Sequence, residues 1–283
     1  MKRILILTCS NDKIGFGHYR RSLSLHNYLN KNFHSEFIDL NHVNLNFGSI
    51  QCDLVIFDNP YDMSEEVNIL KARNIRTIGL DTNYNSSTDL TLSIYEHNQH
   101  SHNNRIQNFN FAIIRDEILQ LPKEGKNIFE NQVLISLGGS DLKKDSLPIA
   151  KILLEKGFYV TLVYGPLAKL ESFENSNLKI VQNPKNLPSL MHQCDIAITN
   201  GGGTLFELLY LHKPVVIIPQ TEAEERISAH VRTNGSIIGV GYSYLDNLNS
   251  FNPAEFKKNF KPLVDGKGLE NITKYIVEVL NAQ

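Results

Sequence analysis

The chain has 283 residues, a length that can hold two domains of ordinary size. Hydrophobic residues make up 41% of it and charged residues 20%, which is typical of a globular protein with a sizeable core. The formal net charge of -2 gives no basis for a nucleic-acid-binding protein, and no apolar run approaches membrane-spanning length. We therefore expect neither nucleic-acid binding nor stable insertion into a membrane.

The start of the chain and its cysteines predict a cytoplasmic protein. Residues 1–3 run directly into a short apolar segment, without the small-residue cleavage site of a signal peptide. The three cysteines are odd in number and lack metal-ligand spacing. Cys52 and Cys194 precede apolar runs and are expected to be reduced core thiols. Cys9 ends the first apolar run, where simple packing and a nucleophilic role are both open.

A glycine-rich turn follows the first apolar run. Ile4 to Leu7 predicts a strand, and the leucines within residues 22–29 recur at helical spacing. The turn between them, residues 15–21, delivers His18 to the carboxyl end of a strand, where open α/β sheets bind ligands. Its glycines permit close backbone approach, and the helix N-terminus that follows favours negative charge. His18 is then a candidate acid or base, with a hydrogen-bonded structural histidine as the alternative.

Short, continuous apolar runs recur along the whole chain. Because apolar and polar residues do not alternate in them, they predict strands buried on both faces of a parallel sheet. Helical patterns at residues 147–156 and 187–192 lie between the runs, which predicts a doubly wound α/β architecture. The predicted strands are residues 4–7, 54–57, 78–80, 111–114, 133–137, 160–163, 196–198 and 215–218.

The segment from Leu119 to Asn131 interrupts this pattern. It contains lysine, glycine and proline, and a strand, a glycine turn and a helix begin again at Gln132. We therefore expect an N-terminal Rossmann-like domain of residues 1–125 and a C-terminal one of residues 131–283, with the carboxyl edges of both sheets facing a central cleft. Residues 269–280 predict a terminal helix, for which packing on its own domain or back on the first is open.

The stretch from Asn83 to Asn110 is rich in asparagine, serine and histidine and is predicted to be an irregular loop. His97, His100 and His102 are close in sequence, but no acidic residue or cysteine follows at a metal-ligand spacing. We predict neither a metal site nor a cofactor.

A second glycine turn, Asn-Gly-Gly-Gly at residues 200–203, follows the strand 196–198 and opens a predicted helix over 205–211. Successive glycines can direct backbone N–H groups at a diphosphate, and Thr204 can add a hydroxyl. Glu207 lies one turn into the helix, where its carboxylate could accept hydrogen bonds from ribose hydroxyls. A solvated helix residue is the alternative.

Two further polar segments follow strands of the second half. The turn at residues 138–141 could bring Gly139 and Ser140 to a phosphate, or its Asp141 could cap the next helix. The segment 219–226, after the strand 215–218, has polar side chains that could hold a sugar. It also has the spacing of a capping box, with a threonine at 221 and a glutamate at 224.

The order of these motifs resembles a known group of enzymes. Gly-Phe-Gly-His-x-x-Arg at 15–21, Gly-Gly-Ser-Asp at 138–141 and Gly-Gly-Thr-Leu-x-Glu at 202–207 are together similar to the pattern of the GT-B fold. More closely, the chain resembles the UDP-sugar hydrolases of pseudaminic acid biosynthesis. Those enzymes cleave UDP from UDP-2,4-diacetamido-2,4,6-trideoxy-β-L-altropyranose and are similar to the glycosyltransferases that make lipid II. The resemblance covers nearly the whole chain.

The resemblance implies roles for the matching positions. His18 would activate water for attack on the anomeric carbon, and the second glycine turn would bind UDP. Asp58 and Asp81, which follow predicted strands, match acidic positions of the family's first domain. No residue is assigned to a metal, although Asp58 and Asp62 stay open as carboxylates for a divalent cation. The implied substrate-binding residues are Gly15, Gly17, Arg21, Asp58, Asp81, Gly139, Ser140, Gly201, Gly202, Gly203, Thr204, Leu205, Glu207, Gln220 and Glu224.

One position departs from the family. The hydrolases have a tyrosine two residues after the position of Asp58, where this chain has Pro60 and places Tyr61 one residue further. The second glycine turn is also richer in glycine than the hydrolase pattern, as in the transferases. The identity of the sugar is therefore left open.

Three functions remain to be distinguished. The first is hydrolysis of a UDP-activated amino sugar in the biosynthesis of a nonulosonic acid or related surface glycan, by a monomer or homodimer. The second is transfer of the sugar to a lipid or glycan acceptor. Residues 20–33 contain Arg20, Arg21 and Lys31 but no broad apolar face for an anionic membrane, which favours the hydrolase. The third, a nucleotide-sugar binding module, would not need a histidine in the first turn.

Overall fold

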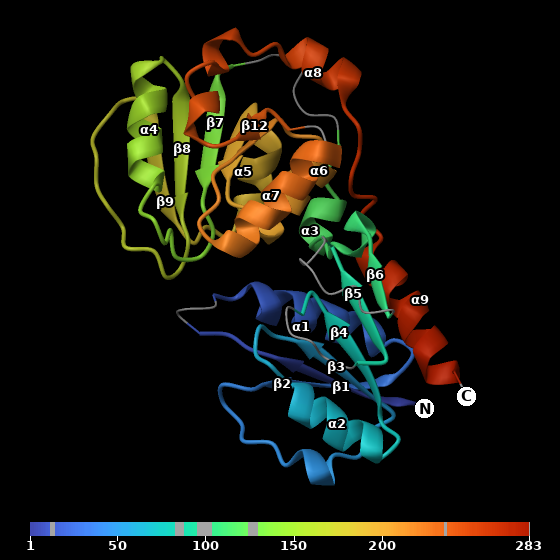
Figure 1. Ribbon diagram of the computed structural model, residues 1–283. Helices are drawn as coiled ribbons and strands as arrows, with labels where there is room; N and C mark the ends of the chain where they lie inside the picture. Colours follow the sequence, from blue (N-terminus) through green and yellow to red (C-terminus); the bar gives the residue numbers. More distant parts are fainter. Residues whose placement is uncertain (12–14, 83–87, 95–103, 124–129, 235–236, 283) are drawn as a thin grey trace. The chain divides into compact units, whose positions relative to one another are not determined.

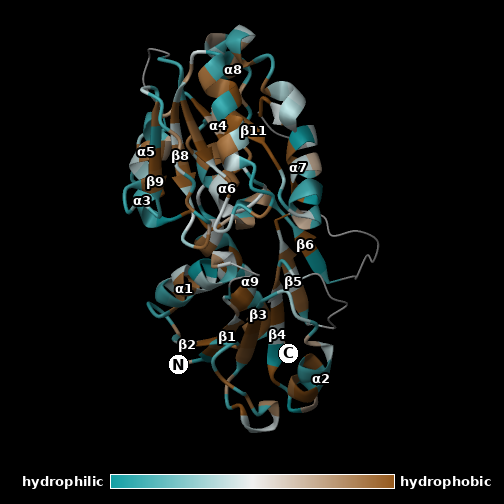
Figure 2. Cartoon of the chain, turned by 90° about the vertical axis from the view of Figure 1, so that its left-hand side faces the viewer, coloured by the Kyte–Doolittle hydropathy of each residue, from teal (hydrophilic) through white to brown (hydrophobic). Residues whose placement is uncertain are grey.

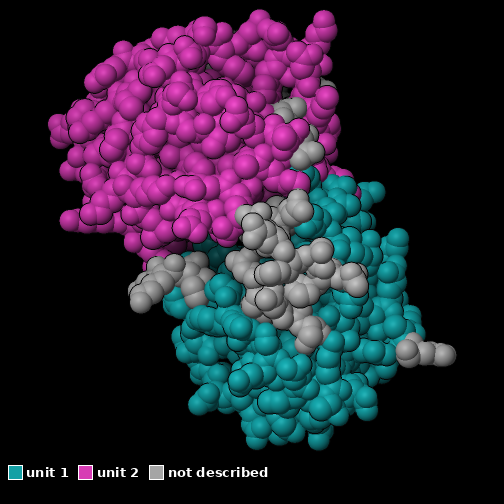
Figure 3. All heavy atoms as spheres, in the orientation of Figure 1, with its two compact units in different colours: residues 1–113, 267–283 teal, residues 114–266 magenta. Residues whose placement is uncertain are grey.

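The computed structural model describes residues 1–11, 15–82, 88–94, 104–123, 130–234 and 237–282 (Figure 1). The chain forms two compact units, drawn in different colours in Figure 3. Unit 1 consists of Met1–Ile113 and Lys267–Gln283, and unit 2 of Ile114–Gly266. None of the helices in the described residues is long and apolar enough to cross a membrane.

Unit 1 contains a parallel sheet of six strands with helices beside it. Since all strands run in one direction, the segments that follow β1, β3 and β4 emerge at the same edge of the sheet. Thr8 and Asp58 are partners in the register at that edge. In spatial order the strands are β2 (His34–Asp39), β1 (Arg3–Thr8), β3 (Leu54–Asp58), β4 (Arg76–Leu80), β5 (Leu90–Ser93) and β6 (Arg105–Gln107). The helices are α1 (Gly17–Leu29), α2 (Ser64–Ala72) and α9 (Gly268–Asn281), with short 3-10 turns η1 (Phe47–Ser49) and η2 (Phe109–Phe111).

Unit 2 repeats the arrangement with a second six-stranded parallel sheet. In spatial order its strands are β12 (Gly239–Val240), β11 (Val215–Ile217), β10 (Ile196–Thr199), β7 (Gln132–Ser136), β8 (Tyr159–Tyr164) and β9 (Leu178–Gln182). Its helices are α3 (Asp116–Leu119), α4 (Ser146–Glu155), α5 (Leu187–Gln193), α6 (Gly203–Tyr210), α7 (Glu222–Asn234) and α8 (Pro253–Asn259), with 3-10 turns η3 (Tyr242–Tyr244) and η4 (Leu248–Ser250).

The central strands are buried along their length. All residues of β3, β10 and β11 are buried, which is what a parallel strand covered on both faces requires. Figure 2 shows the strands mainly as hydrophobic and α7 with many hydrophilic residues. The prediction of two Rossmann-like α/β domains, each with a parallel sheet, is confirmed.

Two segment predictions are wrong. The apolar run 111–114 is not a strand: its first residue ends η2, which begins where the Asn108 side chain accepts a hydrogen bond from the Asn110 amide. The run is apolar because Phe111, Ala112 and Ile114 are buried outside any sheet. Conversely, the segment 83–110 was expected to be a loop but contains β5 and β6. His97, His100 and His102 lie outside the described residues.

The division of the chain differs from the expected boundaries of 1–125 and 131–283. The units divide between Ile113 and Ile114, and the terminal helix is counted with unit 1. Within that unit α9 contacts η2, α1 and β4. Gly268, the first residue of α9, lies very close to the backbone of Ala112. A Cβ on Gly268 would be 2.2 Å from the carbonyl oxygen of Ala112. This close approach, together with the contacts of α9 to η2, α1 and β4, explains why the helix belongs with unit 1.

Candidate functional site

The first glycine turn joins β1 to α1, as the sequence predicts. Gly15 has a φ of +78°, and its amide donates to the carbonyl of Asn11 over 2.7 Å. This left-handed conformation suits glycine, which has no Cβ to oppose it. A Cβ on Gly17 would meet nothing within 4 Å. Gly15 thus shapes the turn, while Gly17 leaves open space at the start of α1.

His18 is held by a buried carboxylate. Its Nδ1 lies 2.7 Å from Oδ1 of Asp58, whose side chain is fully buried, while 24% of the His18 side chain is exposed. An ionised carboxylate only accepts hydrogen bonds, so Nδ1 carries the proton and donates it to Asp58. That tautomer leaves the lone pair on Nε2, the nitrogen that a general base would use. The expected acid-base residue therefore has an orienting partner.

Arg21 connects the two acidic positions of unit 1. Its Nε donates to Oδ2 of Asp58 over 3.0 Å, and its two terminal nitrogens contact Asp58 and Asp81. Ser22 donates to Oδ2 of Asp58 over 2.7 Å. Oδ1 of Asp81 accepts from the Ile94 amide over 2.7 Å. The structure brings the predicted residues His18, Arg21, Asp58 and Asp81 together. Arg21 is hydrogen-bonded to both aspartates.

The electrostatics of this cluster keep Asp58 ionised. Burial alone would raise the pKa of the Asp58 carboxyl, but the charge of Arg21 and the hydrogen bond from His18 outweigh it. The net result is a pKa well below the usual range of an aspartate. The pKa of Arg21 is raised in turn by the charges of Asp58 and Asp81, against the effect of its own burial. The Asp58 carboxylate therefore stays ionised and can accept the hydrogen bond from Nδ1 of His18 at any physiological pH.

Cys9 and Asp62 contribute no reactive group here. Cys9 is fully buried, and burial together with the charges of Asp58 and Asp39 raises the pKa of its thiol to about 12. A thiol of this kind is a poor nucleophile near neutral pH. Asp62 accepts hydrogen bonds from the amide and hydroxyl of Ser64 at the start of α2. Across the described residues, no group of three or more metal-ligating side chains is found.

Tyr61, one residue beyond the family's tyrosine position, lies near the first glycine turn. Its hydroxyl donates to Oδ1 of Asn41 over 3.0 Å and accepts from Nδ2 of Asn11 over 3.4 Å. Asn11 is also the bridge partner of Gly15. The one-residue shift therefore still leaves a tyrosine, 37% exposed, close to the turn that carries His18.

In unit 2 the second glycine turn leads into α6. Gly202 is the N-cap, and no side chain caps the first amides of the helix. The first N–H groups of a helix lack intrahelical partners, so they are available to an anion. Gly203 is exposed and Thr204 is half-buried. Leu205 contributes no ligand-binding group, because its side chain is buried and its amide donates to the Gly202 carbonyl over 3.0 Å.

Glu224 and Gln220 both make hydrogen bonds to other residues of unit 2. The Glu224 carboxylate accepts from Nδ2 of Asn200 over 2.6 Å and from the Gln220 amide over 2.7 Å. Its amide donates to Oγ1 of Thr221 over 3.3 Å, as the capping-box pattern predicts. Burial raises the pKa of the Glu224 carboxyl. Gln220 is 6% exposed and bonds to Lys143, Asp145 and Ile218.

The third glycine turn lies against the second one. Gly138 has a φ of +85°, and a Cβ on it would lie 2.7 Å from Nδ2 of Asn200. Gly139 has open space around it. Asp141 accepts hydrogen bonds from the amides of Asp145 and Ser146 over 3.1 and 3.3 Å, which is the capping alternative. Ser140, which lies between Gly139 and Asp141 in the sequence, is half-buried. Asn200 therefore joins two turns that both follow central strands.

Replacement of a glycine by alanine should destabilise the protein at Gly201 but not at Gly203, although both lie in the second glycine turn. A Cβ on Gly201 would lie 2.8 Å from the carbonyl oxygen and 2.9 Å from the Cα of Glu224, whereas a Cβ on Gly203 would meet nothing within 4 Å. We expect Gly201→Ala to lower the free energy of unfolding by about 1–3 kcal/mol, because backbone atoms must move. Gly203→Ala should change it little. Urea unfolding of both variants measures the difference, and equal stabilities would contradict the close approach.

Glu207 is buried and paired. It is 6% exposed, so the solvated alternative is wrong. Both of its oxygens accept from the guanidinium of Arg115: Oε1 from Nε over 2.5 Å and Oε2 from a terminal nitrogen over 2.7 Å. The sequence did not single out Arg115, because it follows the apolar run mistaken for a strand and is 92 positions away from Glu207.

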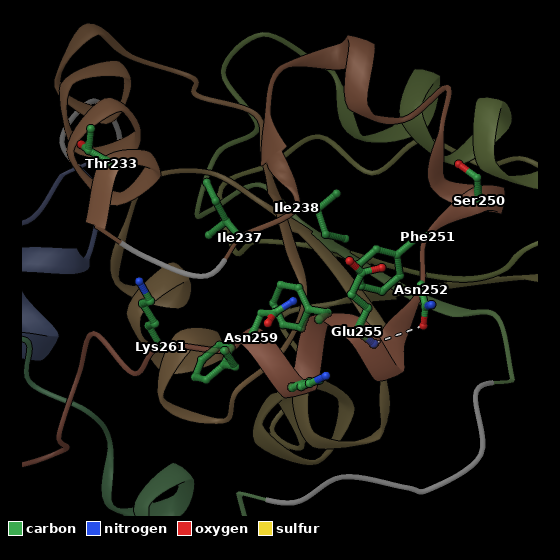
Figure 4. Close-up of a pocket in the computed structure, with 12 residues that line it drawn as sticks. Thr233, Ile237, Ile238, Ser250, Phe251, Asn252, Glu255, Asn259 and Lys261 are labelled. Atoms are coloured by element: carbon green, nitrogen blue, oxygen red, sulfur yellow. Dashed lines mark hydrogen bonds between the residues drawn. The ribbon is translucent and has the colours of Figure 1, made fainter.

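A cavity of about 990 Å³ lies elsewhere in unit 2, around α8 and the segment that leads into β12 (Figure 4). None of the site residues predicted from the sequence lines it. Its walls include Ile237, Ile238, Phe251, Phe256, Phe260 and Lys261. The glycine turns follow the carboxyl ends of their strands, whereas Ile237 and Ile238 precede β12. The cavity is therefore separate from the candidate ligand-binding turns.

Comparison with known proteins agrees with this division of the chain. Residues 115–235, which lie in unit 2, match the glycosyltransferase family 28 C-terminal domain. The chain is 26% identical over 273 residues to uncharacterized protein MJ1062 of Methanocaldococcus jannaschii, covering 78% of this chain and 56% of that protein.

Two further relatives have described activities. A Helicobacter pylori protein named pseudaminic acid cytidylyltransferase and UDP-2,4-diacetamido-2,4,6-trideoxy-beta-L-altropyranose hydrolase is 29% identical over 156 residues, or 54% of this chain and 29% of that one. A Prochlorococcus marinus UDP-N-acetylglucosamine--N-acetylmuramyl-(pentapeptide) pyrophosphoryl-undecaprenol N-acetylglucosamine transferase is 27% identical over 170 residues, or 56% and 45%. The chain thus spans about half or less of the length of these relatives.

Solved structures establish the fold. Acinetobacter baumannii MurG superimposes with a TM-score of 0.59 at 13% identity, over 98% of this chain and 100% of that one. The UDP-GlcNAc 2-epimerase of Methanocaldococcus jannaschii, in complex with UDP-GlcNAc and UDP, gives a TM-score of 0.59 at 14% identity over the same shares. The chain therefore has the GT-B fold of two Rossmann-like domains, with a C-terminal domain like that of glycosyltransferase family 28.

Proposed function

We propose that this protein is an enzyme that binds a UDP-sugar and cleaves the bond between the anomeric carbon and the diphosphate, with water as the acceptor. The observation that carries the proposal is the pair formed by His18 at the start of α1 and Asp58 at the end of β3, in which Asp58 fixes the tautomer of His18. The match of residues 115–235 to a glycosyltransferase domain supports a nucleotide-sugar ligand.

In this proposal His18 acts as a general base. Its Nε2 takes a proton from water as the water oxygen bonds to the anomeric carbon. The bond from that carbon to the β-phosphate oxygen breaks, and UDP leaves with the electron pair. The products are UDP and the free sugar. Asp58 stabilises the imidazolium that forms and does not leave its ionised state, because Arg21 and Ser22 also bind it.

Unit 2 would bind the nucleotide. The uncapped amides at the start of α6 and the open space at Gly139 and Gly203 suit a diphosphate. These amides also stabilise the charge that develops on the leaving group. Glu207, further along α6, would accept hydrogen bonds from the ribose. No step of this proposal requires a metal ion.

For the substrate we propose a UDP-linked 2,4-diacetamido-2,4,6-trideoxy hexose, as part of nonulosonic acid or related surface-glycan biosynthesis. The hydrolase activity named for the Helicobacter pylori relative supports it, together with the motif order at residues 15–21, 138–141 and 202–207. Tyr61 and Asn41, near the first glycine turn, are the side chains we expect closest to the sugar's substituents.

Transfer to an acceptor hydroxyl is the second candidate function. The match to glycosyltransferase family 28 and the Prochlorococcus marinus relative favour it. The same base would then deprotonate the acceptor hydroxyl instead of water. The two functions differ only in the nucleophile, so the catalytic groups alone do not discriminate between them.

Release of UDP without an acceptor tests the proposal. The full chain is incubated with UDP-linked diacetamido-trideoxy sugars, and UDP and free sugar are measured together. We expect them to form in equal amounts from the wild type. Binding of UDP with release only after an acceptor glycan or lipid is added would establish the transferase instead. Conversion to an epimeric UDP-sugar without UDP release would overturn both.

A further inference from the structure

Both carboxylate oxygens of Glu207, which lies one turn into α6, accept hydrogen bonds from one side chain. The Arg115 guanidinium approaches as a planar fork, with contacts of 2.5 and 2.7 Å. The Glu207 side chain is 7% exposed and that of Arg115 is 31% exposed. Burial would lower the pKa of Arg115, but the hydrogen bonds and charge of Glu207 raise it. The pair is therefore a charge-assisted, bidentate contact.

The fork leaves part of the carboxylate's hydrogen-bonding capacity unused. An ionised carboxylate has about four lone-pair sites, and Arg115 occupies two of them. Among the described residues, Arg115 provides the only side-chain contacts that the structure gives to the Glu207 carboxylate. The remaining capacity equals the two hydroxyls that a ribose can donate. A carboxylate that is already desolvated gains more from such donors than one in water.

The backbone of Arg115 is itself fixed. Its carbonyl accepts from the amides of Ile118 and Leu119 over 2.9 and 3.1 Å at the start of α3. Gly266 approaches the same region: a Cβ on it would lie 2.5 Å from the ring of Tyr210, the last residue of α6, and 2.9 Å from Leu119. Arg115 therefore reaches Glu207 from a segment that is packed against the far end of α6.

We propose that Arg115 is a positioning residue for nucleotide recognition: it holds the Glu207 carboxylate in one orientation so that its free lone pairs accept the ribose hydroxyls. The inference rests on the proposed binding of UDP by unit 2. It assigns ribose selectivity to a pair of residues, of which Arg115 does not touch the ligand. Lysine would be a poor substitute, because an ammonium cannot grip both oxygens in a plane.

Binding of matched nucleotides to the full chain tests the proposal. Isothermal titration calorimetry with UDP, 2′-deoxy-UDP and 3′-deoxy-UDP gives the preference for each ribose hydroxyl. We expect the wild type to prefer UDP over at least one deoxy analogue by about 10- to 100-fold, the value of a hydrogen bond to a charged group. Glu207→Gln should lose most of that preference. Arg115→Leu should lose it too, although Glu207 is still present, and Arg115→Lys should fall between them.

Two controls separate positioning from a general structural effect. The preference for UDP over uridine reports the diphosphate contact and should stay unchanged in the Arg115 variants. Arg73→Leu removes another arginine with two hydrogen bonds, to the carbonyls of Phe47 and Ile50 in unit 1, and should leave every preference as in the wild type. Circular dichroism and melting curves check folding, and Arg115→Lys serves if Arg115→Leu does not fold.

The outcomes are distinct. Full ribose preference in a folded Arg115 variant overturns the positioning role and leaves the proposed function standing. Tighter UDP binding by Arg115→Leu would mean that Arg115 competes with the ribose, which also overturns it. A wild type that binds UDP with no preference among the ribose analogues overturns the role of Glu207. A wild type that binds no UDP overturns the proposed function itself.

Discussion

Replacement of His18 by alanine is expected to lower the rate of UDP release by about 100- to 10,000-fold, the usual contribution of general acid-base catalysis. His18 is the only histidine among residues 15–21, and its Nδ1 lies 2.7 Å from Oδ1 of Asp58. UDP affinity should be unchanged, because we assign nucleotide binding to unit 2. Steady-state release of UDP and calorimetric binding of UDP measure the two effects separately.

Asp58→Asn tests whether the pair acts as a unit. The substitution keeps the volume but removes the charge that fixes the His18 tautomer, so UDP release should fall by a similar factor. The double variant should then be little slower than either single one, since groups that act together are not additive. His26→Ala is the matched control on the same helix, because its Nδ1 lies 3.1 Å from Oγ of Ser35 in β2 and its Nε2 lies 3.1 Å from Nδ2 of Asn30. Additive losses would show that Asp58 acts independently of His18.

The sequence predicted the centre of each sheet and missed the edges. The predicted strands that exist are β1, β3, β4, β7, β8, β10 and β11, all of which have neighbours on both sides. The outermost strands, β2, β6, β9 and β12, were missed, and so was β5. An edge strand is open to solvent along one side, so it does not need a continuous apolar run. The pattern in β9, where no residue is fully buried, illustrates this.

The site residues show a comparable limit. The chain positions of His18, Asp58 and Asp81 follow from strand ends, because parallel strands release their residues at one edge. The hydrogen-bond partners of their side chains cannot be deduced from the strand ends. Whether Asp81 faces a ligand or Arg21 depends on the rotamer and on contacts across 60 residues of sequence. The ion pair of Glu207 spans 92 residues and could not be deduced from local patterns.

The capping box at Thr221 and Glu224 illustrates why a motif can have two interpretations. The local pattern predicts the cap, and the structure contains it. The same carboxylate, however, also accepts from Asn200 in the second glycine turn. A sequence motif specifies the local hydrogen bond but not the tertiary one. Glu224 thus fixes the second glycine turn as well as the start of α7.

Replacement of Arg21 by leucine is expected to lower the free energy of unfolding by about 3–5 kcal/mol, the usual cost of leaving buried charges without their partner. Asp58 is fully buried and Asp81 is 10% exposed, and Arg21 is the cation that bridges them. Arg20→Leu is the matched control, because Arg20 is exposed at the neighbouring position of α1 and its loss should cost less than about 0.5 kcal/mol. Urea unfolding near pH 7 compares the two variants. Equal stabilities would mean that solvent reaches the cluster.

The pH dependence of that loss follows from the Asp58 carboxyl. In the wild type its pKa is lowered, so its contribution to stability is present above the pKa of about 4 of an unfolded aspartate and is lost as the pH falls through the folded value. Without Arg21, burial is no longer offset, and the folded pKa of Asp58 should rise. The destabilisation caused by the unpaired Asp58 carboxylate is then greatest near pH 7. It is lost as the pH falls through the raised pKa of Asp58, because the carboxyl becomes neutral. The stability gap between the wild type and Arg21→Leu should therefore narrow from pH 7 to pH 4. A gap that stays constant over this range would mean that His18 and Ser22 alone keep the carboxylate ionised.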